Sequence, residues 1–140
     1  MTDLSDAGLA RLRREAGPRC GYCRTSSKIT GQPLTVEHLL PVARGGSSDE
    51  DNLWLVCRRC NEFKGAQVEA ADPETGEVVR LFNPRRQVWR EHFAWSGDGA
   101  RIIGLTPCGR TTIVVLRLNN EDIVSARRLW VSAGWHPPQG

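Results

Sequence analysis

The first segment of the chain has its apolar residues at helical spacing. Leucine and alanine side chains fall on one face of residues 4–16, which predicts a short amphipathic helix. Asp3 or Ser5 is available as its N-cap, and Gly17-Pro18 follows its last turn. The arginines of this helix are therefore expected to face solvent or a ligand.

From residue 19 to about residue 70, short apolar runs alternate with turn-forming residues. Leu34–His38 and Leu53–Val56 have the length and composition of buried strands, and Gly45–Ser48 has the composition of a loop. A helix is expected to follow, running toward Ala70. Two short cysteine-containing turns flank the strands, so the predicted order is turn, strand, loop, strand, turn, helix.

Residues 71–140 predict a further mixture of strands and helices. The expected elements are a turn at 72–77, a strand at 78–82, a hairpin with strands at 93–95 and 101–105, and a last helix from Asn119 or Asn120 to Gly134 with Ile123, Leu129 and Trp130 on its apolar side. Residues 110–118 are ambiguous, because β-branched side chains favour a strand while the leucines that follow suit either period. The fold class is therefore α+β.

Composition places the chain among globular proteins of about one domain. It has 140 residues, 39% of them hydrophobic and 25% charged, and no apolar run approaches the length of a membrane span. The first residues are acidic, unlike a secretory leader, so we expect a cytoplasmic protein without a membrane partner. Thiols stay reduced in that compartment, so the 5 cysteines call for another explanation than disulfides.

Net charge by itself does not identify a partner. The chain carries 19 Lys and Arg against 16 Asp and Glu, a net charge of +3. Nearly all the cations are arginines, whose planar group suits phosphate, but genome base composition can produce the same bias.

The cysteines form two matched pairs. Cys20 and Cys23 share one Cys-x-x-Cys turn, Cys57 and Cys60 share another, and 33 residues lie between the pairs. Two such turns can offer four thiolates to one tetrahedral ion, so the spacing predicts a structural four-cysteine zinc site. A dithiol redox motif or unrelated buried thiols would not require a second pair. Cys108 stands apart and is expected to be a free thiol without a role.

The stretch between and just after the pairs contains a second recognisable pattern. It reads Glu37-His38, then Gly45-Gly46, then Asn52-Leu53, and closes on Cys57-x-x-Cys60-Asn61-x-x-Lys64-Gly65. Over about residues 19–65 this pattern resembles the HNH endonuclease family. The resemblance implies a small ββα-metal, treble-clef-like core, held together by the four-cysteine zinc site and followed by an α+β C-terminal extension.

The resemblance also implies roles for individual residues. His38 matches the general base that takes a proton from the attacking water, and Asn52 matches the residue that holds the loop and keeps the His ring aimed. Asn61 and Glu37 match ligands of a catalytic Mg²⁺ or another divalent cation. The family usually has Asp where this chain has Glu37, whose carboxylate reaches about 1.5 Å further.

The chemistry of phosphodiester hydrolysis asks for the same residue types. Histidine supplies a base that is neutral near pH 7, and a divalent cation neutralises the charge that grows at the phosphate. Glu37 and Asn61 together offer one negative charge and one neutral oxygen, so we expect weak cation binding until substrate phosphate adds its own oxygens. The alternatives are a structural histidine and, for Asn52, a turn or cap residue.

Three cations follow the second strand closely. Arg58, Arg59 and Lys64 are expected to contact nucleic-acid phosphates, although solvated charge is the plain alternative. Nothing in the sequence resembles a base-reading helix, so DNA is the expected partner with little sequence preference.

We therefore expect an N-terminal helix at residues 1–18, an HNH nuclease core with its zinc site at 19–70, and an extension at 71–140 packed on the core. The predicted function is metal-dependent hydrolysis of DNA that leaves 5′-phosphate and 3′-hydroxyl ends, as the family does. The rival prediction is a zinc-stabilised nucleic-acid-binding module that has lost hydrolysis. The extension has three open roles: a substrate clamp, a dimer surface or further core.

Overall fold

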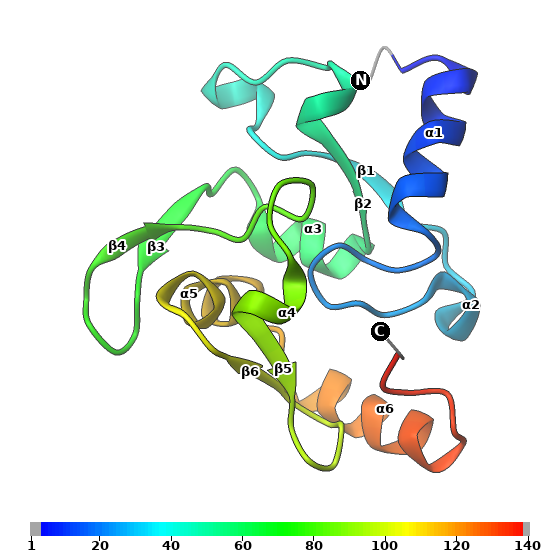
Figure 1. Cartoon of the computed structure of the whole chain (residues 1–140), viewed down its shortest axis with the longest axis vertical. Coiled ribbons are helices and arrows are strands. Elements are labelled where there is room, and N and C mark those ends of the chain that lie inside the picture. The colour runs from blue at the N-terminus through cyan, green and yellow to red at the C-terminus, as the bar shows by residue number, and fades with distance from the viewer. Residues whose placement is uncertain (1–3, 139–140) are drawn as a thin grey trace. The chain divides into compact units, whose positions relative to one another are not determined.

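The chain divides into two compact units. The structure, a computed structural model, describes residues 4–138 (Figure 1). Unit 1 contains the chain up to Val68 together with Asn83–Gln87, and unit 2 contains Glu69–Phe82 and the chain from Val88 onward. The chain thus leaves unit 1 after Val68, and a short later segment belongs to unit 1 again.

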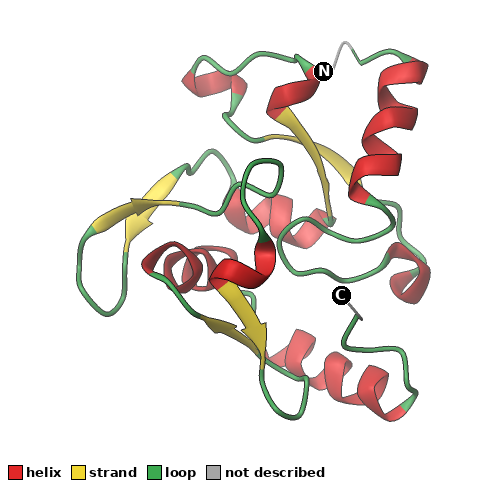
Figure 2. Cartoon of the chain, viewed as in Figure 1, coloured by secondary structure: helices red, strands yellow, loops and turns green. Residues whose placement is uncertain are grey.

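Unit 1 is built on one antiparallel hairpin with helices beside it (Figure 2). Its elements in order are α1 (Asp6–Ala16), α2 (Ser27–Thr30), β1 (Thr35–His38), the 3-10 turns η1 (Val42–Arg44) and η2 (Glu50–Asn52), β2 (Leu53–Val56) and α3 (Arg58–Lys64). In the hairpin Glu37 pairs with Trp54, and His38 pairs with Leu53. The strand, loop, strand and helix order predicted for this segment is confirmed.

The core of unit 1 lies between α1 and the hairpin. Leu12 of α1 and Leu53 of β2 are fully buried, and Leu55 packs with them. Helix α1 starts where the sequence indicated, because the Ser5 side chain accepts a hydrogen bond from the Gly8 N–H and caps it. The predicted amphipathic helix is confirmed, with its leucine face against the strands.

Helix α3 is shorter than predicted. It ends at Lys64, because Gly65 follows with a φ of +54° and a ψ of −134°, a non-helical conformation that glycine adopts readily. Ala70, where the helix was expected to end, lies instead in strand β3 (Glu69–Ala71) of unit 2.

Unit 2 contains two hairpins and two longer helices. Its remaining elements are β4 (Val78–Arg80), α4 (Trp89–His92), β5 (Phe93–Trp95), β6 (Ile102–Gly104), α5 (Pro107–Leu116) and α6 (Glu121–Ser132). β3 pairs with β4 and β5 pairs with β6, both antiparallel, so the predicted hairpin around residues 96–101 is confirmed. None of the helices within residues 4–138 has the length and apolar composition needed to cross a membrane.

Residues 110–118, which the sequence left ambiguous between strand and helix, are mostly helical. Thr106 accepts a hydrogen bond from the Gly109 N–H as N-cap, and Pro107 occupies the first turn of α5. Thr111 and Thr112 are buried in the helix. A well-capped start and burial outweigh the weak strand preference of β-branched residues.

Helix α6 begins as predicted, and Ile123 and Trp130 lie in its core as expected, but Leu129 does not. Asn120 caps it by accepting a hydrogen bond from the Ile123 N–H, and Ile123 is buried. Leu129, expected on the apolar side, is 71% exposed. Arg127 is buried instead, with its Nη1 group donating to the Ala100 carbonyl at 3.1 Å and its guanidinium over the Trp95 ring.

Candidate functional site: a four-cysteine cluster beside a histidine loop

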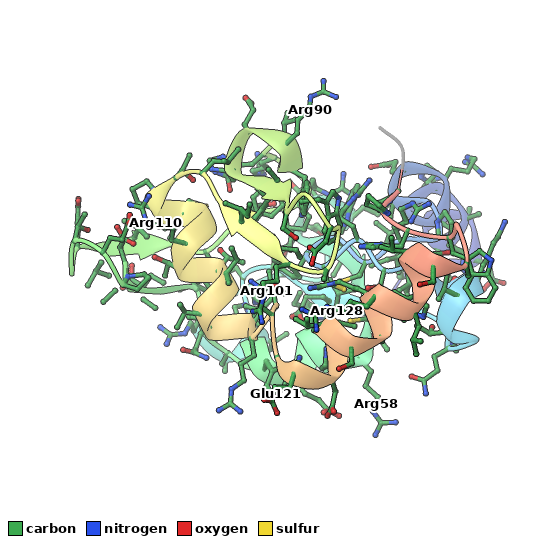
Figure 3. The ribbon with its side chains drawn as sticks, turned by 90° about the horizontal axis from the view of Figure 1, so that it is seen from below. Arg58, Arg90, Arg101, Arg110, Glu121 and Arg128 are labelled. Atoms are coloured by element: carbon green, nitrogen blue, oxygen red, sulfur yellow. The ribbon has the colours of Figure 1, made fainter. Side chains whose placement is uncertain are left out.

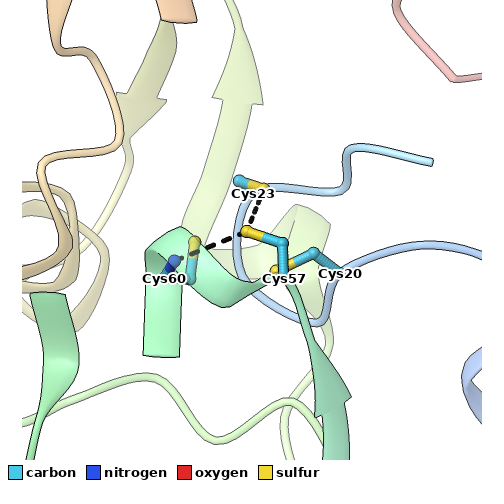
Figure 4. Close-up of side chains that lie close together, drawn as sticks. All are labelled: Cys20, Cys23, Cys57 and Cys60. Carbon is cyan, nitrogen blue, oxygen red and sulfur yellow. Dashed lines mark hydrogen bonds between the residues drawn. The ribbon is translucent and has the colours of Figure 1, made fainter. Parts of the chain in front are cut away.

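The four paired cysteines converge on one point (Figure 4). Their Sγ atoms all lie within 4.8 Å of one another, and those of Cys23 and Cys57 are 3.7 Å apart. Tetrahedral zinc bound to four thiolates at about 2.3 Å sets sulfur–sulfur distances near 3.8 Å. All four cysteines are free thiols. The cluster could therefore hold a metal such as zinc. Within residues 4–138 no second group of His, Cys, Asp or Glu ligands is gathered this closely.

Backbone contacts hold the first cysteine turn against the hairpin. The Gly21 N–H donates to the Leu55 carbonyl at 3.0 Å, and the Cys20 N–H donates to the Thr25 carbonyl at the same distance. A Cβ atom on Gly21 would come within 2.4 Å of the Trp54 ring, so a side chain there would force the turn away from β2. The second turn begins α3, where the Cys57 sulfur accepts from the Cys60 N–H.

Arg59 lies at this cluster. Its Nη2 group is 3.9 Å from the Cys23 sulfur. Burial lowers the pKa of Arg59, but the neighbouring cysteine sulfurs outweigh this and raise it. Four thiolates on a divalent ion leave two excess negative charges, so a cation here stabilises a metal-bound cluster.

His38 ends strand β1 and faces a loop serine. Its Nε2 atom lies 3.1 Å from the Ser48 hydroxyl, and both residues are half-buried. Ser48 belongs to the loop that the glycine pair Gly45-Gly46 opens. The structure thus brings the expected base together with a residue that sequence reasoning missed, because a serine beside a glycine pair is an ordinary loop residue.

Asn52 ties that loop to the end of the strand. Its Oδ1 atom accepts from the Leu40 N–H at 2.9 Å, and its amide donates to the carbonyls of Leu40 at 3.0 Å and Ser47 at 2.7 Å. A Cβ atom on Gly46 would lie 1.7 Å from the Leu40 carbonyl oxygen, so the loop closes this tightly only with glycine. Three bonds from one amide fix the position of Ser48 relative to His38.

Glu37 of β1 and Lys64 of α3 form a buried ion pair. Their side chains are 7% and 2% exposed, and Lys64 Nζ lies 3.8 Å from Glu37 Oε1. The ammonium group also donates to the Leu39 carbonyl at 3.3 Å. Burial raises the pKa of Glu37 although Lys64 opposes this, and burial lowers the pKa of Lys64 although Glu37 opposes that.

This burial corrects one expectation. Lys64 was expected to contact DNA phosphate, but its ammonium group is enclosed and engaged by Glu37 and Leu39. The sequence carried no sign of it, because a lysine one turn along a helix from Asn61 is normally exposed.

The expected cation ligands lie on neighbouring elements. Glu37 Oε2 is buried and has no hydrogen-bond partner among the described residues, so one carboxylate oxygen is left for a further ligand. Asn61 is half-buried on α3 and, three residues before Lys64, shares a helix face with it. A carboxylate oxygen without a partner and an amide oxygen are both ligands that suit a hard divalent cation.

The structure does not join all the predicted site residues. Glu37 contacts Lys64 of α3, whereas His38 contacts Ser48 of the loop. No hydrogen bond or ion pair connects the two groups within the described residues. Arg58 is exposed and pairs with Glu62 at 3.2 Å, one turn along α3.

Comparison with known proteins places this site in a family. The HNH endonuclease family matches residues 20–67, which include both cysteine pairs, His38, Asn52 and Asn61. The resemblance inferred from the sequence is therefore confirmed, and with it the α+β fold class. No curated protein sequence and no solved structure matches the chain.

Proposed function

We propose that the HNH endonuclease segment at residues 20–67 hydrolyses phosphodiester bonds of DNA in a divalent-metal-dependent reaction. The family match supports a nuclease-type or nucleic-acid-related function. One observation supports hydrolysis in particular: the hydrogen-bonded loop of Asn52 and Ser48 holds the His38 ring in a fixed position. A histidine that only filled space would not need such a loop.

His38 acts as general base in this proposal. When Nε2 carries the proton and donates a hydrogen bond to the Ser48 hydroxyl, the lone pair of Nδ1 is free to take a proton from the attacking water. A base of this kind contributes about 10²–10⁴-fold to the rate. Ser48 is then a positioning residue, and the products carry 5′-phosphate and 3′-hydroxyl ends.

Glu37 and Asn61 would hold the catalytic cation, Mg²⁺ or another divalent ion. When bound, such an ion neutralises charge on the scissile phosphate and on the leaving oxygen. Glu37 offers its orphaned Oε2 atom, and Lys64 holds the other carboxylate oxygen in place. The amide oxygen of Asn61 supplies a neutral ligand without adding buried charge.

The four cysteines serve the structure in this proposal, as a zinc site. Cys20 and Cys23 precede the hairpin, whereas Cys57 and Cys60 follow it. Zinc therefore closes the segment that carries Glu37, His38 and Asn52, and it fixes the start of α3 relative to β2.

A nucleic-acid-binding module without hydrolysis is the second candidate. The Glu37–Lys64 ion pair favours it, because a carboxylate already compensated by an ammonium 3.8 Å away attracts a cation less strongly. Binding to DNA would then persist with every metal while no phosphodiester bond is broken.

Nicking of supercoiled plasmid tests the proposal against this alternative. Zinc-loaded protein is incubated with Mg²⁺, with Mn²⁺ and with no added divalent ion, alongside His38→Ala. We expect metal-dependent nicking that His38→Ala abolishes while DNA binding remains. Retarded but intact plasmid with every metal would overturn the enzyme and support the binding module.

The role of Ser48 is tested by comparison with its neighbour. Ser48→Ala should lower kcat about tenfold with KM unchanged, and Ser48→Thr should recover most of the loss because it keeps the hydroxyl. Ser47→Ala is the matched control, since Ser47 is exposed and contributes to the Asn52 clamp only through its carbonyl. Equal kcat values for the two alanine variants would contradict a positioning role.

A further inference from the structure

Two adjoining hollows in unit 1 lie away from the histidine loop. The larger has a volume of about 340 Å³ and is lined by the end of α1, by α2 and by the chain before β1. The smaller, about 80 Å³, is lined by α2 and by the start of α3. Both are lined by Ser27, Pro33 and Leu34, so the two hollows adjoin, and together they are here called the α1–α2 groove.

The α1–α2 groove is strongly basic. Arg13 and Lys28 line the larger hollow, Arg58 and Arg59 line the smaller, and neither lining contains Asp or Glu. Residues 13–34 carry five Lys and Arg against Glu15 alone, a charge of +4 in a chain whose total is +3. Glu15 is itself paired with Arg85 at 2.9 Å. The net positive charge of the protein is therefore concentrated in the segment that supplies most of the lining of this groove.

Two of the four lining cations form no ion pair with a carboxylate of the described residues. Arg59 compensates the cysteine cluster, and Arg58 pairs with Glu62, although its side chain still points outward (Figure 3). Arg13 and Lys28 are exposed, and no carboxylate in residues 4–138 forms an ion pair with either. The larger hollow thus presents two cations without an ion-pair partner, one from α1 and one from α2.

The rest of the lining suits a sugar–phosphate strand. The Ser27 side chain can bond a phosphate oxygen, and Pro33 and Leu34 offer an apolar surface to a sugar. Leu34 precedes β1 directly and His38 ends it, so at about 3.3 Å per residue the groove lies roughly 13 Å from the histidine loop. That separation corresponds to about four base steps of a duplex at 3.4 Å each.

We propose that the α1–α2 groove binds the DNA backbone on one side of the cleaved bond, through Arg13 and Lys28. This inference rests on the proposed function, because it takes DNA as the substrate. Contacts to phosphate alone give affinity without base preference, so the groove positions the duplex and leaves its sequence unread.

Salt-dependent DNA binding tests the groove. A fluorescein-labelled duplex of mixed sequence is titrated with zinc-loaded His38→Ala protein, without added Mg²⁺, over a series of salt concentrations. The groove variant adds Arg13→Gln and Lys28→Gln. The control adds Arg80→Gln and Arg101→Gln, which remove the same charge from exposed positions of unit 2. All melting curves are compared to verify folding.

The groove variant should bind about tenfold more weakly at 0.15 M salt. Its slope of log K against log salt should be shallower by about 1.8, or 0.9 for each lost phosphate contact. The control should keep the parental slope. Equal salt slopes in the groove variant and the control would overturn the proposal. An equal loss of affinity for polyglutamate on replacing Arg13 and Lys28 would also overturn it, because the two cations would then attract any polyanion.

Failure of the groove and failure of the proposed function give different results. The titration does not require cleavage. A changed salt slope in the groove variant, without plasmid nicking by the wild-type protein, would support DNA binding by the groove and contradict the proposed nuclease activity. Nicking by the wild type with unchanged slopes would do the reverse.

Discussion

Replacing Lys64 by methionine separates a structural lysine from a DNA-binding one. Methionine keeps most of the side-chain volume but removes the ammonium group that faces Glu37 and donates to the Leu39 carbonyl. If Lys64 holds Glu37, the variant loses stability. If Lys64 contacted DNA, the variant would instead lose affinity and salt dependence.

The size of the stability loss follows from the burial of the pair. An exposed ion pair is worth about 0.2–1 kcal/mol, whereas removing one partner of a buried pair costs about 3–5 kcal/mol. Side-chain exposures of 2% and 7% place this pair in the second class, while the 3.8 Å separation makes it a long contact. We therefore expect a loss near the lower end, about 3 kcal/mol.

The sign of the pH dependence follows from the Glu37 carboxyl. Burial raises the pKa of Glu37 above its unfolded value, and the loss of Lys64 would raise it further. A raised carboxyl pKa gives a folded state that is more stable below that pKa and loses stability as pH rises through it. The deficit of Lys64→Met should therefore be larger at pH 8 than at pH 5.

Urea unfolding of four proteins measures this coupling: wild type, Lys64→Met, Glu37→Gln and the double variant. The double variant should recover more than half of the Lys64→Met deficit, because no charge remains buried without a partner. Strictly additive losses, or a Lys64→Met protein as stable as wild type but with a shallower salt slope for DNA binding, would refute the buried pair.

Three further predictions concern other parts of the chain. Cys57→Ser should release the metal and abolish cooperative melting, because structural zinc contributes on the order of 10 kcal/mol, as much as the whole stability of a small domain. Cys108→Ser is the control. One zinc per chain retained by Cys57→Ser would contradict the assignment. Hydrogen bonds from Arg110 hold the pKa of Asp72 well below its ordinary range, so their contribution to the free energy of unfolding is present above about pH 4 and is lost as pH falls further. Asp72→Asn should therefore flatten the fall in unfolding free energy below about pH 4. An unchanged pH profile in this variant would argue against the contribution. Gly46→Ala should displace the histidine loop and lower the cleavage rate at least tenfold, because its Cβ would clash with the Leu40 carbonyl. Gly45→Ala meets no atom within 4 Å and should cost only about 1 kcal/mol of stability, from its φ of +88°. Equal cleavage rates for the two variants would show that the Leu40 contact does not constrain the loop.

Local signals in the sequence predicted the elements that carry the site. The Cys-x-x-Cys pairs, the apolar run Leu53–Val56 and the Ser5 cap each specify structure through neighbouring residues, and each lies where it was expected. The Thr106-Pro107 start of α5 is an equally local signal, but the β-branched run that follows it left residues 110–118 ambiguous in the sequence.

Features that depend on distant contacts could not be predicted. Whether Lys64 is buried depends on Glu37, a strand residue far away in the chain, and the partner of His38 is a loop serine that ordinary turn chemistry already explains. The basic character of the α1–α2 groove was likewise hidden, because charge counted over each half of the chain averages away the cluster at residues 13–34.

Single-turnover cleavage of a labelled duplex tests the central claim most directly. Excess zinc-loaded protein is mixed with the duplex and Mg²⁺, and the rate and the chemistry of the new ends are measured for wild type and His38→Ala. The account predicts 5′-phosphate and 3′-hydroxyl ends, a rate about 10²–10⁴-fold lower in His38→Ala, and equal DNA affinity for the two proteins. Equal cleavage rates, or no cleavage by either protein when all of the duplex is bound, would contradict it.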